Sequence, residues 1–258
     1  MEDGKPSAPA LVLLSNAAVP LALWDPVAPL LADRFRVIRV GLPGPGKASA
    51  ADEYDIPAQA RRVGAALDKL GVNRVTVIGH SSGCTVATSL AEQRPDAVAA
   101  LALIDMGPDP DAKIPENRIF RLILAPLIGP VLWHLKTEAT IRKAARTGFA
   151  RPVDIPDAFI KHVLGMTHRS FAEAMRAPLA YLGQRSLPDR LTDLGLPVLV
   201  VFGADDQRWR SSSAAAYKVV PGARVELLAG VGHTPMMEDP QTTGKLLLDF
   251  AATAGHPS

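Results

Sequence analysis

The sequence predicts an α/β protein with a mostly parallel sheet of about six strands, flanked by helices and interrupted by one helical insert. Three observations support this. Short apolar runs alternate with longer segments of helical period, which is typical of a parallel sheet covered by helices on both faces. Residues 108–190 break the alternation, because they contain helical sequence without a convincing strand. Finally, a glycine- and serine-rich turn at residues 79–83 joins a predicted strand to a predicted helix.

Each strand of the sheet is predicted from a short apolar run, and each helix from apolar residues spaced three and four apart. The segment 56–70 is a typical helix, with Val63, Leu67 and Leu70 on one side and Gly71 as a stop signal. The predicted strands are 11–14, 36–40, 74–78, 98–104, 198–202 and 224–228. The predicted helices that flank them are 20–31, 56–70, 82–93, 212–220 and 240–253.

The strand-free block contains helical segments at roughly 115–135, 137–148, 156–168 and 170–184. A helical block between two strands of a parallel sheet usually lies over their carboxyl ends, where such sheets place their binding sites. The sequence therefore predicts a core domain of residues 1–107 and 191–258 with a helical cap, or lid, of residues 108–190. The alternative is a small helical bundle with no role in binding.

The composition of the chain argues against several kinds of function and partner. The 258 residues are 48% hydrophobic and 21% charged, with a formal net charge of +2, which fits a globular protein with a sizeable core. Interspersed charges and 5% aromatic residues argue against nucleic acid as a partner. The single cysteine, Cys84, allows no intrachain disulfide, and the histidines lack zinc-site spacing, so we expect no metal or other cofactor. The polar N-terminus and the proline-interrupted apolar stretch at 122–133 predict a cytoplasmic protein without stable membrane association.

The turn Gly79-His80-Ser81-Ser82-Gly83 matches the pattern G-x-S-x-G between a strand and a helix. In that context the pattern is typical of a nucleophile elbow, in which the central serine stands on a tight turn and projects its hydroxyl. The flanking glycines let the strand and the helix approach without a Cβ clash. Ser81 is therefore the candidate nucleophile. The alternative is an ordinary small-residue turn with Ser82 as the N-cap of the helix.

A serine hydroxyl needs a base to remove its proton, and the base needs an acid to orient it. His233 is the candidate base, because it lies in the loop between the last strand and the last helix. The other histidines lie in the elbow, the helical insert or the tail. The acid is expected in the loop after the preceding strand, where Asp205 and Asp206 are both candidates.

The chain resembles the α/β-hydrolase superfamily over essentially its full length. The matching segments are LVLL, FRVIRVGLPGPGKAS, VIGHSSG, VLVVFGADD and GVGHTPMMEDP. The resemblance implies a catalytic triad of Ser81, Asp206 and His233, since the acid of this family is usually the third residue after the glycine that ends the strand. It also favours the cap interpretation of the helical block. Asp105, at the end of the strand 98–104, is the fallback acid, because some members place it there.

Ser15-Asn16 follows the first predicted strand, where many relatives have His-Gly. With the Trp-Asp-Pro at residues 24–26, this resembles the 3-oxoadipate enol-lactonase branch. The resemblance implies an oxyanion hole formed by the backbone N–H groups of Ala17 and Ser82. The alternative is a polar turn in which Asn16 bonds the local backbone.

Only ten residues precede the first predicted strand, which is too few for the N-terminal β-hairpin of the relatives. The strand 36–40 would then form an unpaired edge, and such an edge invites pairing with another chain. A homodimer through this edge is therefore a hypothesis.

Together these features predict a serine hydrolase with a small-molecule substrate, namely a small or medium carboxylic ester, lactone or thioester cleaved through an acyl-enzyme. Lactonase activity is favoured mildly by Ser15-Asn16. One alternative is a non-hydrolytic enzyme on the same fold, such as a lyase, cyclase, decarboxylase or cofactor-free peroxidase. The second alternative is a ligand-binding protein without catalysis. The predicted substrate-binding residues are Asn16, Trp24, Leu124, Leu127, Trp133 and Met237.

Overall fold

The computed structural model describes residues 1–43 and 54–254. Their core is a seven-stranded sheet in the order β1-β3-β2-β4-β5-β6-β7, in which every neighbouring pair is parallel except β1 with β3. The predicted class is therefore confirmed. The strands are β1 (Glu2–Asp3), β2 (Ala10–Leu14), β3 (Arg36–Val40), β4 (Val75–His80), β5 (Val98–Ile104), β6 (Val198–Gly203) and β7 (Arg224–Leu228).

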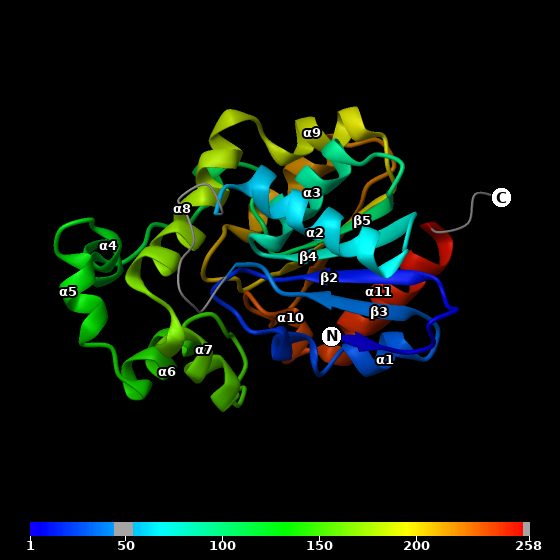
Figure 1. Ribbon diagram of the computed structural model, residues 1–258. Coiled ribbons are helices and arrows are strands. Elements are labelled where there is room, and N and C mark those ends of the chain that lie inside the picture. The colour runs from blue at the N-terminus through cyan, green and yellow to red at the C-terminus, as the bar shows by residue number, and fades with distance from the viewer. Residues whose placement is uncertain (44–53, 255–258) are drawn as a thin grey trace.

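Helices cover both faces of this sheet (Figure 1). On one face, α2 (Ile56–Leu70), α3 (Gly83–Gln93) and α9 (Leu187–Leu194) pack against the sheet through one apolar cluster. The other packs α1 (Ala28–Ala32) and α11 (Pro240–Ala254) on the opposite face. Two predicted helices are less regular than expected. Residues 20–31 form the 3-10 turn η1 (Leu21–Trp24) and the short α1, and residues 212–220 form the 3-10 helix η4 (Ser211–Val219).

The sheet has one strand more than the sequence analysis expects. The expectation that β3 is an unpaired edge is wrong, because the N-terminal arm folds back as β1, with Glu2 opposite Ile38 and Asp3 opposite Val37. Charges hold the arm in place. Arg36 pairs with Glu2 at 2.8 Å, and Arg39 pairs with Asp3 at 2.8 Å. A two-residue strand is too short to be recognised from periodicity, so only the fold reveals it.

The helical block between β5 and β6 lies at the carboxyl end of the sheet (Figure 1), and we refer to it as the cap. The single helix expected at 115–135 is two helices, because Ala125 is extended ahead of Pro126 and a residue before proline disfavours the helical conformation. The cap helices are α4 (Arg118–Leu124), α5 (Gly129–His134), α6 (Glu138–Arg146), α7 (Asp157–Gly165) and α8 (His168–Gln184); η3 (Pro110–Ala112) precedes them and α10 (Pro235–Glu238) lies ahead of α11.

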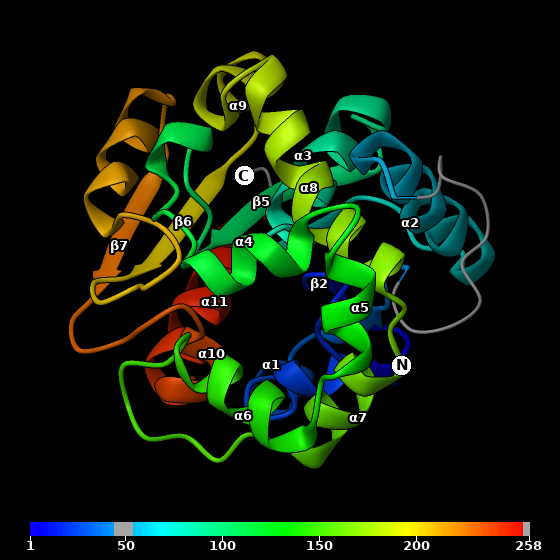
Figure 2. The ribbon, with the colours of Figure 1, turned by 90° about the vertical axis from the view of Figure 1, so that its left-hand side faces the viewer.

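A separate apolar cluster lies in the cap around Trp133, Ile141 and Ile160, and Ala18 from the loop after β2 also belongs to it. Figure 2 looks onto the cap and shows α4 to α7 around its rim, with α8 leading back toward the core domain. At the far end of α8, Tyr181 packs into the core cluster and donates a hydrogen bond to Glu92 at 2.6 Å. The glycine-proline segment that contributes to the family resemblance continues into residues 44–53, which lie outside the described part of the chain. Within that part, no helix combines the length and the apolar character needed to cross a bilayer.

Candidate active site

The tight strand-to-helix turn predicted at 79–83 is present between β4 and α3. Ser81 has φ of 53°, in the left-handed region that a residue with a Cβ rarely adopts. The turn is tight on both sides. A Cβ added at Gly79 would lie 2.6 Å from the backbone nitrogen of Cys84, and one at Gly83 would lie 2.6 Å from the carbonyl oxygen of Leu14. Glycine is therefore required at both positions, and Ser81 stands on a strained turn at the edge of the sheet.

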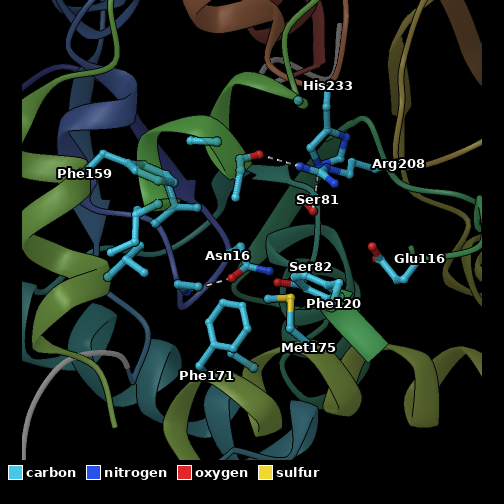
Figure 3. A pocket seen from close by; sticks show the side chains of 18 of the residues that line it. Asn16, Ser81, Ser82, Glu116, Phe120, Phe159, Phe171, Met175, Arg208 and His233 are labelled. Atoms are coloured by element: carbon cyan, nitrogen blue, oxygen red, sulfur yellow. Dashed lines mark hydrogen bonds between the residues drawn. The ribbon is translucent and has the colours of Figure 1, made fainter. Parts of the chain in front are cut away.

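The side chains of Ser81, His233 and Asp206 lie in one hydrogen-bonded line. His233 Nε2 is 3.1 Å from Ser81 Oγ, and His233 Nδ1 is 2.9 Å from Asp206 Oδ2. Figure 3 shows Ser81 and His233 facing each other at the wall of a pocket. With Nδ1–H donated to the carboxylate, Nε2 is left to accept the serine proton. This geometry is the one that a general base next to a nucleophile requires.

The carboxylate of Asp206 is held ionised. Its burial by itself would raise the pKa, but the charge and hydrogen bond of His233 together with N–H donors from Arg208 and Trp209 hold the pKa below its usual value. These two backbone donors reach Oδ1 at 2.6 and 3.3 Å. The structure thus distinguishes the two acids considered from the sequence, because Asp205 lies exposed in the same loop and only Asp206 contacts His233.

The fallback acid, Asp105, follows β5 and lies next to Asp206. It is completely buried, and its Oδ1 accepts a hydrogen bond from the Gly203 N–H at 2.7 Å. Burial, reinforced by the negative charge of Asp206, raises the pKa of Asp105 well above its usual value. These surroundings favour the neutral form of Asp105 beside an ionised Asp206. Ligand atoms of Asp105, Asp206 and His233 lie within 4.8 Å of one another. In this group His233 and Asp206 are hydrogen-bonded to each other. A protonated carboxyl is a poor metal ligand.

The two backbone N–H groups predicted to form an oxyanion hole, those of Ala17 and Ser82, have no acceptor within the described residues. Asn16 makes the local turn that the alternative interpretation expects, since its Oδ1 accepts the Ala18 N–H at 2.7 Å. Both interpretations are therefore compatible, because the turn occupies the N–H of Ala18 and leaves that of Ala17 available. From the cap, the imidazole of His162 donates to the carbonyl oxygen of Ala17 at 3.1 Å, and burial lowers the pKa of His162, which favours its neutral form.

The loop that carries His233 is fixed by contacts that the sequence did not reveal. His80 donates through Nε2 to the carbonyl oxygen of His233 at 2.7 Å. Burial and the neighbouring His233 lower the pKa of His80 to about 3, so that it stays neutral. The backbone N–H of His233 donates to the carbonyl oxygen of Gly148, at the end of the cap helix α6, at 2.8 Å.

Glu238 in α10 adds a second fixation of the same loop. Its carboxylate accepts N–H bonds from Gly232 at 3.0 Å and Thr234 at 3.2 Å, on either side of the histidine. It also accepts N–H bonds from Ala150 at 2.8 Å and Arg151 at 3.0 Å, which belong to the cap. One buried side chain thus joins the cap to the histidine loop. No sequence signal marks it, since an acid at the start of a helix is common.

A cavity of about 510 Å³ lies between the cap and the sheet, with Ser81, Ser82 and His233 in its wall (Figure 3). Its lining is mainly apolar, and the charged side chains in it are those of Lys113, Glu116, Lys136 and Arg208. Arg208 also bridges to the cap, where its Nη2 donates to Thr147 Oγ1 at 2.7 Å. The apolar lining contributed by the cap includes Phe120, Ile123, Leu124, Trp133, Phe159, Phe171 and Met175.

Two of the six predicted substrate-binding residues do not line this cavity. Trp24 is fully buried in the cluster shared with α1 and α11, because η1 turns its indole into the core. Leu127 is 91% exposed, because the break between α4 and α5 places it on an outer turn. These two placements correct the sequence analysis. The predicted residues that do line the cavity are Asn16, Leu124, Trp133 and Met237.

Comparison with known proteins agrees with this architecture. A family model described as alpha/beta hydrolase family matches residues 18–244. The chain belongs to this family. A pimeloyl-[acyl-carrier protein] methyl ester esterase from Aeromonas hydrophila is 30% identical over 249 residues, which cover 94% of this chain and 95% of that protein. Monoacylglycerol lipase abhd6-A from Xenopus laevis is 25% identical, with 97% of this chain and 77% of the lipase covered.

Among solved structures, the enol-lactonase from Burkholderia xenovorans matches with a TM-score of 0.75 and 22% identity, covering 98% of this chain and 95% of the enol-lactonase. At that identity the likeness is evidence for the alpha/beta hydrolase fold. The family and the esterase and lipase relatives support a hydrolase.

Proposed function

We propose that this alpha/beta hydrolase is a serine hydrolase that cleaves a carboxylic ester, lactone or thioester carrying an apolar acyl group. The observation that carries the proposal is the line from Ser81 through His233 to Asp206 at the wall of an apolar cavity of about 510 Å³. The names of the Aeromonas and Xenopus relatives, an esterase and a lipase, support ester chemistry.

In the proposed mechanism, His233 takes the proton of Ser81 as Oγ attacks the acyl carbonyl carbon. Asp206 orients the imidazole and stabilises its protonated form. The backbone N–H groups of Ala17 and Ser82 bind the developing oxyanion, and one such donor contributes about 10²–10³ in rate. His233 then protonates the leaving alkoxide or thiolate. A water molecule attacks the acyl-enzyme with His233 as base, which releases the acid and restores Ser81.

The cavity lining sets the expected preference for the acyl group. Burial of apolar surface contributes about 0.8 kcal/mol per methylene, which is up to about fourfold in kcat/KM for each methylene that the cavity accommodates. We therefore expect kcat/KM for p-nitrophenyl esters to rise from acetate to hexanoate or octanoate. A flat profile over this series would contradict an acyl-binding role for the cavity.

The triad itself is tested by a serine-reactive phosphonate and by Ser81→Ala. The phosphonate should add to Ser81, as located by peptide mass spectrometry, and should abolish turnover. Ser81→Ala should lose turnover of every ester in the series. Ester turnover that persists in Ser81→Ala would contradict Ser81 as the nucleophile. A wild-type protein that neither turns over esters nor reacts with the phosphonate would favour the ligand-binding alternative.

A further inference from the structure

Exposed apolar side chains are concentrated on one part of the molecule. Of the large hydrophobic side chains that are exposed in the described part of the chain, six of nine lie between residues 119 and 135. They belong to α4, α5 and their connections, at the end of the cap far from the sheet (Figure 1). Single exposed apolar residues are ordinary, but a contiguous group marks an interaction surface. This cap-tip surface consists of Ile119, Leu122, Leu127, Ile128, Val131 and Leu135.

The charged side chains within the cap-tip segment itself are all positive. The segment 117–137 contains Arg118, Arg121 and Lys136 but no aspartate or glutamate. Arg118 and Arg121 are exposed, and neither side chain makes an ion pair with a described residue. Two short helices with apolar side chains and unpaired cations have the composition of elements that lie in the interface of an anionic bilayer.

The cap-tip surface is continuous with the cavity. Ile119 and Leu135 are exposed members of the surface, and both also line the cavity that leads to Ser81. An apolar substrate dissolved in a bilayer would therefore meet the entrance of the cavity wherever this surface rests on the lipid. A polar protein partner would not explain why the apolar residues of the surface continue into the lining of the cavity.

We propose that the cap-tip surface docks reversibly on a bilayer rich in anionic phospholipid, with the apolar side chains in the headgroup region and Arg118 and Arg121 against the phosphates. Such docking needs no spanning helix. It goes further than the expectation drawn from the sequence, which excluded only a stable association with membranes. The surface itself is distinct from the triad, so the docking does not depend on turnover.

The test is co-sedimentation of the full chain with vesicles of phosphatidylcholine alone or of phosphatidylcholine mixed with phosphatidylglycerol. We expect binding that requires phosphatidylglycerol and weakens as salt is raised, because the electrostatic part is screened. Binding should be the same for Ser81→Ala, so that a failure of the proposed ester hydrolysis and a failure of docking can be told apart.

Val131→Glu provides the decisive variant, and Val219→Glu is its matched control. Both valines are exposed, at 62% and 68%, but Val219 ends η4 on the core, away from the cap. We expect Val131→Glu to weaken vesicle binding by about tenfold or more, since it removes an apolar contact and adds a charge that the anionic surface repels. Val219→Glu should bind like the wild type.

Replacing both arginines by alanine gives an independent test of the charges. Each cation near an anionic surface contributes about fivefold in binding, so Arg118→Ala with Arg121→Ala should weaken binding by roughly 25-fold. This variant also covers the case in which Val131→Glu fails to fold, which circular dichroism would detect.

Three results would overturn the docking proposal. They are an absence of binding to phosphatidylglycerol vesicles, binding that all of these cap variants leave unchanged, and a wild-type dimer in analytical ultracentrifugation that Val131→Glu dissociates while Val219→Glu does not. The last result would assign the cap-tip surface to a second copy of the chain.

Discussion

Asp105 and Asp206 stand side by side at the carboxyl ends of β5 and β6, and their surroundings favour opposite protonation states. Asp206 is ionised, because His233 and two backbone N–H groups stabilise its charge. Asp105 favours the neutral form, because burial and the neighbouring charge of Asp206 raise its pKa. Two carboxyl groups in contact cannot both ionise at low energy, so the one with more donors keeps the charge.

The two acids should therefore respond differently to the same substitution. Asp206→Asn should lower kcat/KM by about 10⁴-fold, because the amide would leave His233 in the wrong tautomer. Asp105→Asn should change kcat/KM by less than about tenfold, or 1.4 kcal/mol, because asparagine resembles a protonated carboxyl. Steady-state kinetics on one p-nitrophenyl ester measures both. A larger loss in Asp105→Asn than in Asp206→Asn would make Asp105 the acid of the triad.

The pKa of Asp105 also predicts how stability depends on pH. Its pKa in the folded protein lies above the unfolded value of about 3.9. The raised pKa of Asp105 therefore adds to the free energy of unfolding. This contribution is complete at pH values below the unfolded pKa and is lost as the pH rises toward the folded pKa. The free energy of unfolding of Asp105→Asn minus that of the wild type should increase between pH 4 and pH 7 in urea titrations. A difference independent of pH would show that Asp105 ionises equally in both states.

At the scale of elements, the site depends on contacts between the cap and the histidine loop. The loop after β7 receives His80 from the elbow, Gly148 from the end of α6 and Glu238 from α10. Arg208 adds a bond from the loop after β6 to Thr147. The position of His233 therefore depends on contacts with the cap as well as on the sheet.

Glu238→Gln tests this dependence. The amide nitrogen of glutamine would replace one acceptor and face backbone donors, and each buried N–H left unpaired costs about 1–3 kcal/mol. We expect a lower melting temperature and a lower kcat, together with slower phosphonate labelling of Ser81 well below that temperature. Glu173→Gln, in the cap helix α8, is the control, because among the described residues its carboxylate pairs with Arg176 at the surface. Unchanged labelling in Glu238→Gln would limit Glu238 to a stabilising role.

At the scale of the whole molecule, the N-terminal arm closes one edge of the sheet. β1 pairs with β3, and the ion pairs from Arg36 and Arg39 to Glu2 and Asp3 reinforce this pairing. With the arm in place β3 is not an open edge, so this edge gives no reason to expect a homodimer. A short charged strand of this kind is a known way of protecting an edge from association.

Removal of residues 1–5 should restore the open edge. We expect the truncated protein to associate as its concentration is raised, because β3 would present unpaired N–H and C=O groups. Light scattering of the truncated and full chains over the same concentration range measures this. Glu2→Gln with Asp3→Asn, which keeps the backbone pairing, should stay closer to the full chain. A truncated protein that stays monomeric would mean that the edge is protected without the arm.

The sequence by itself determined the alternation of strands and helices, the elbow at Ser81 and the loop position of His233. These features are local, because hydrophobic periodicity and glycine spacing report directly on backbone conformation. Tertiary structure decided which acid contacts His233, that β1 covers β3, that Glu238 joins the cap to the histidine loop, and that Trp24 is buried while Leu127 is exposed. Each of these depends on burial and pairing between segments far apart in the chain, which no local pattern encodes.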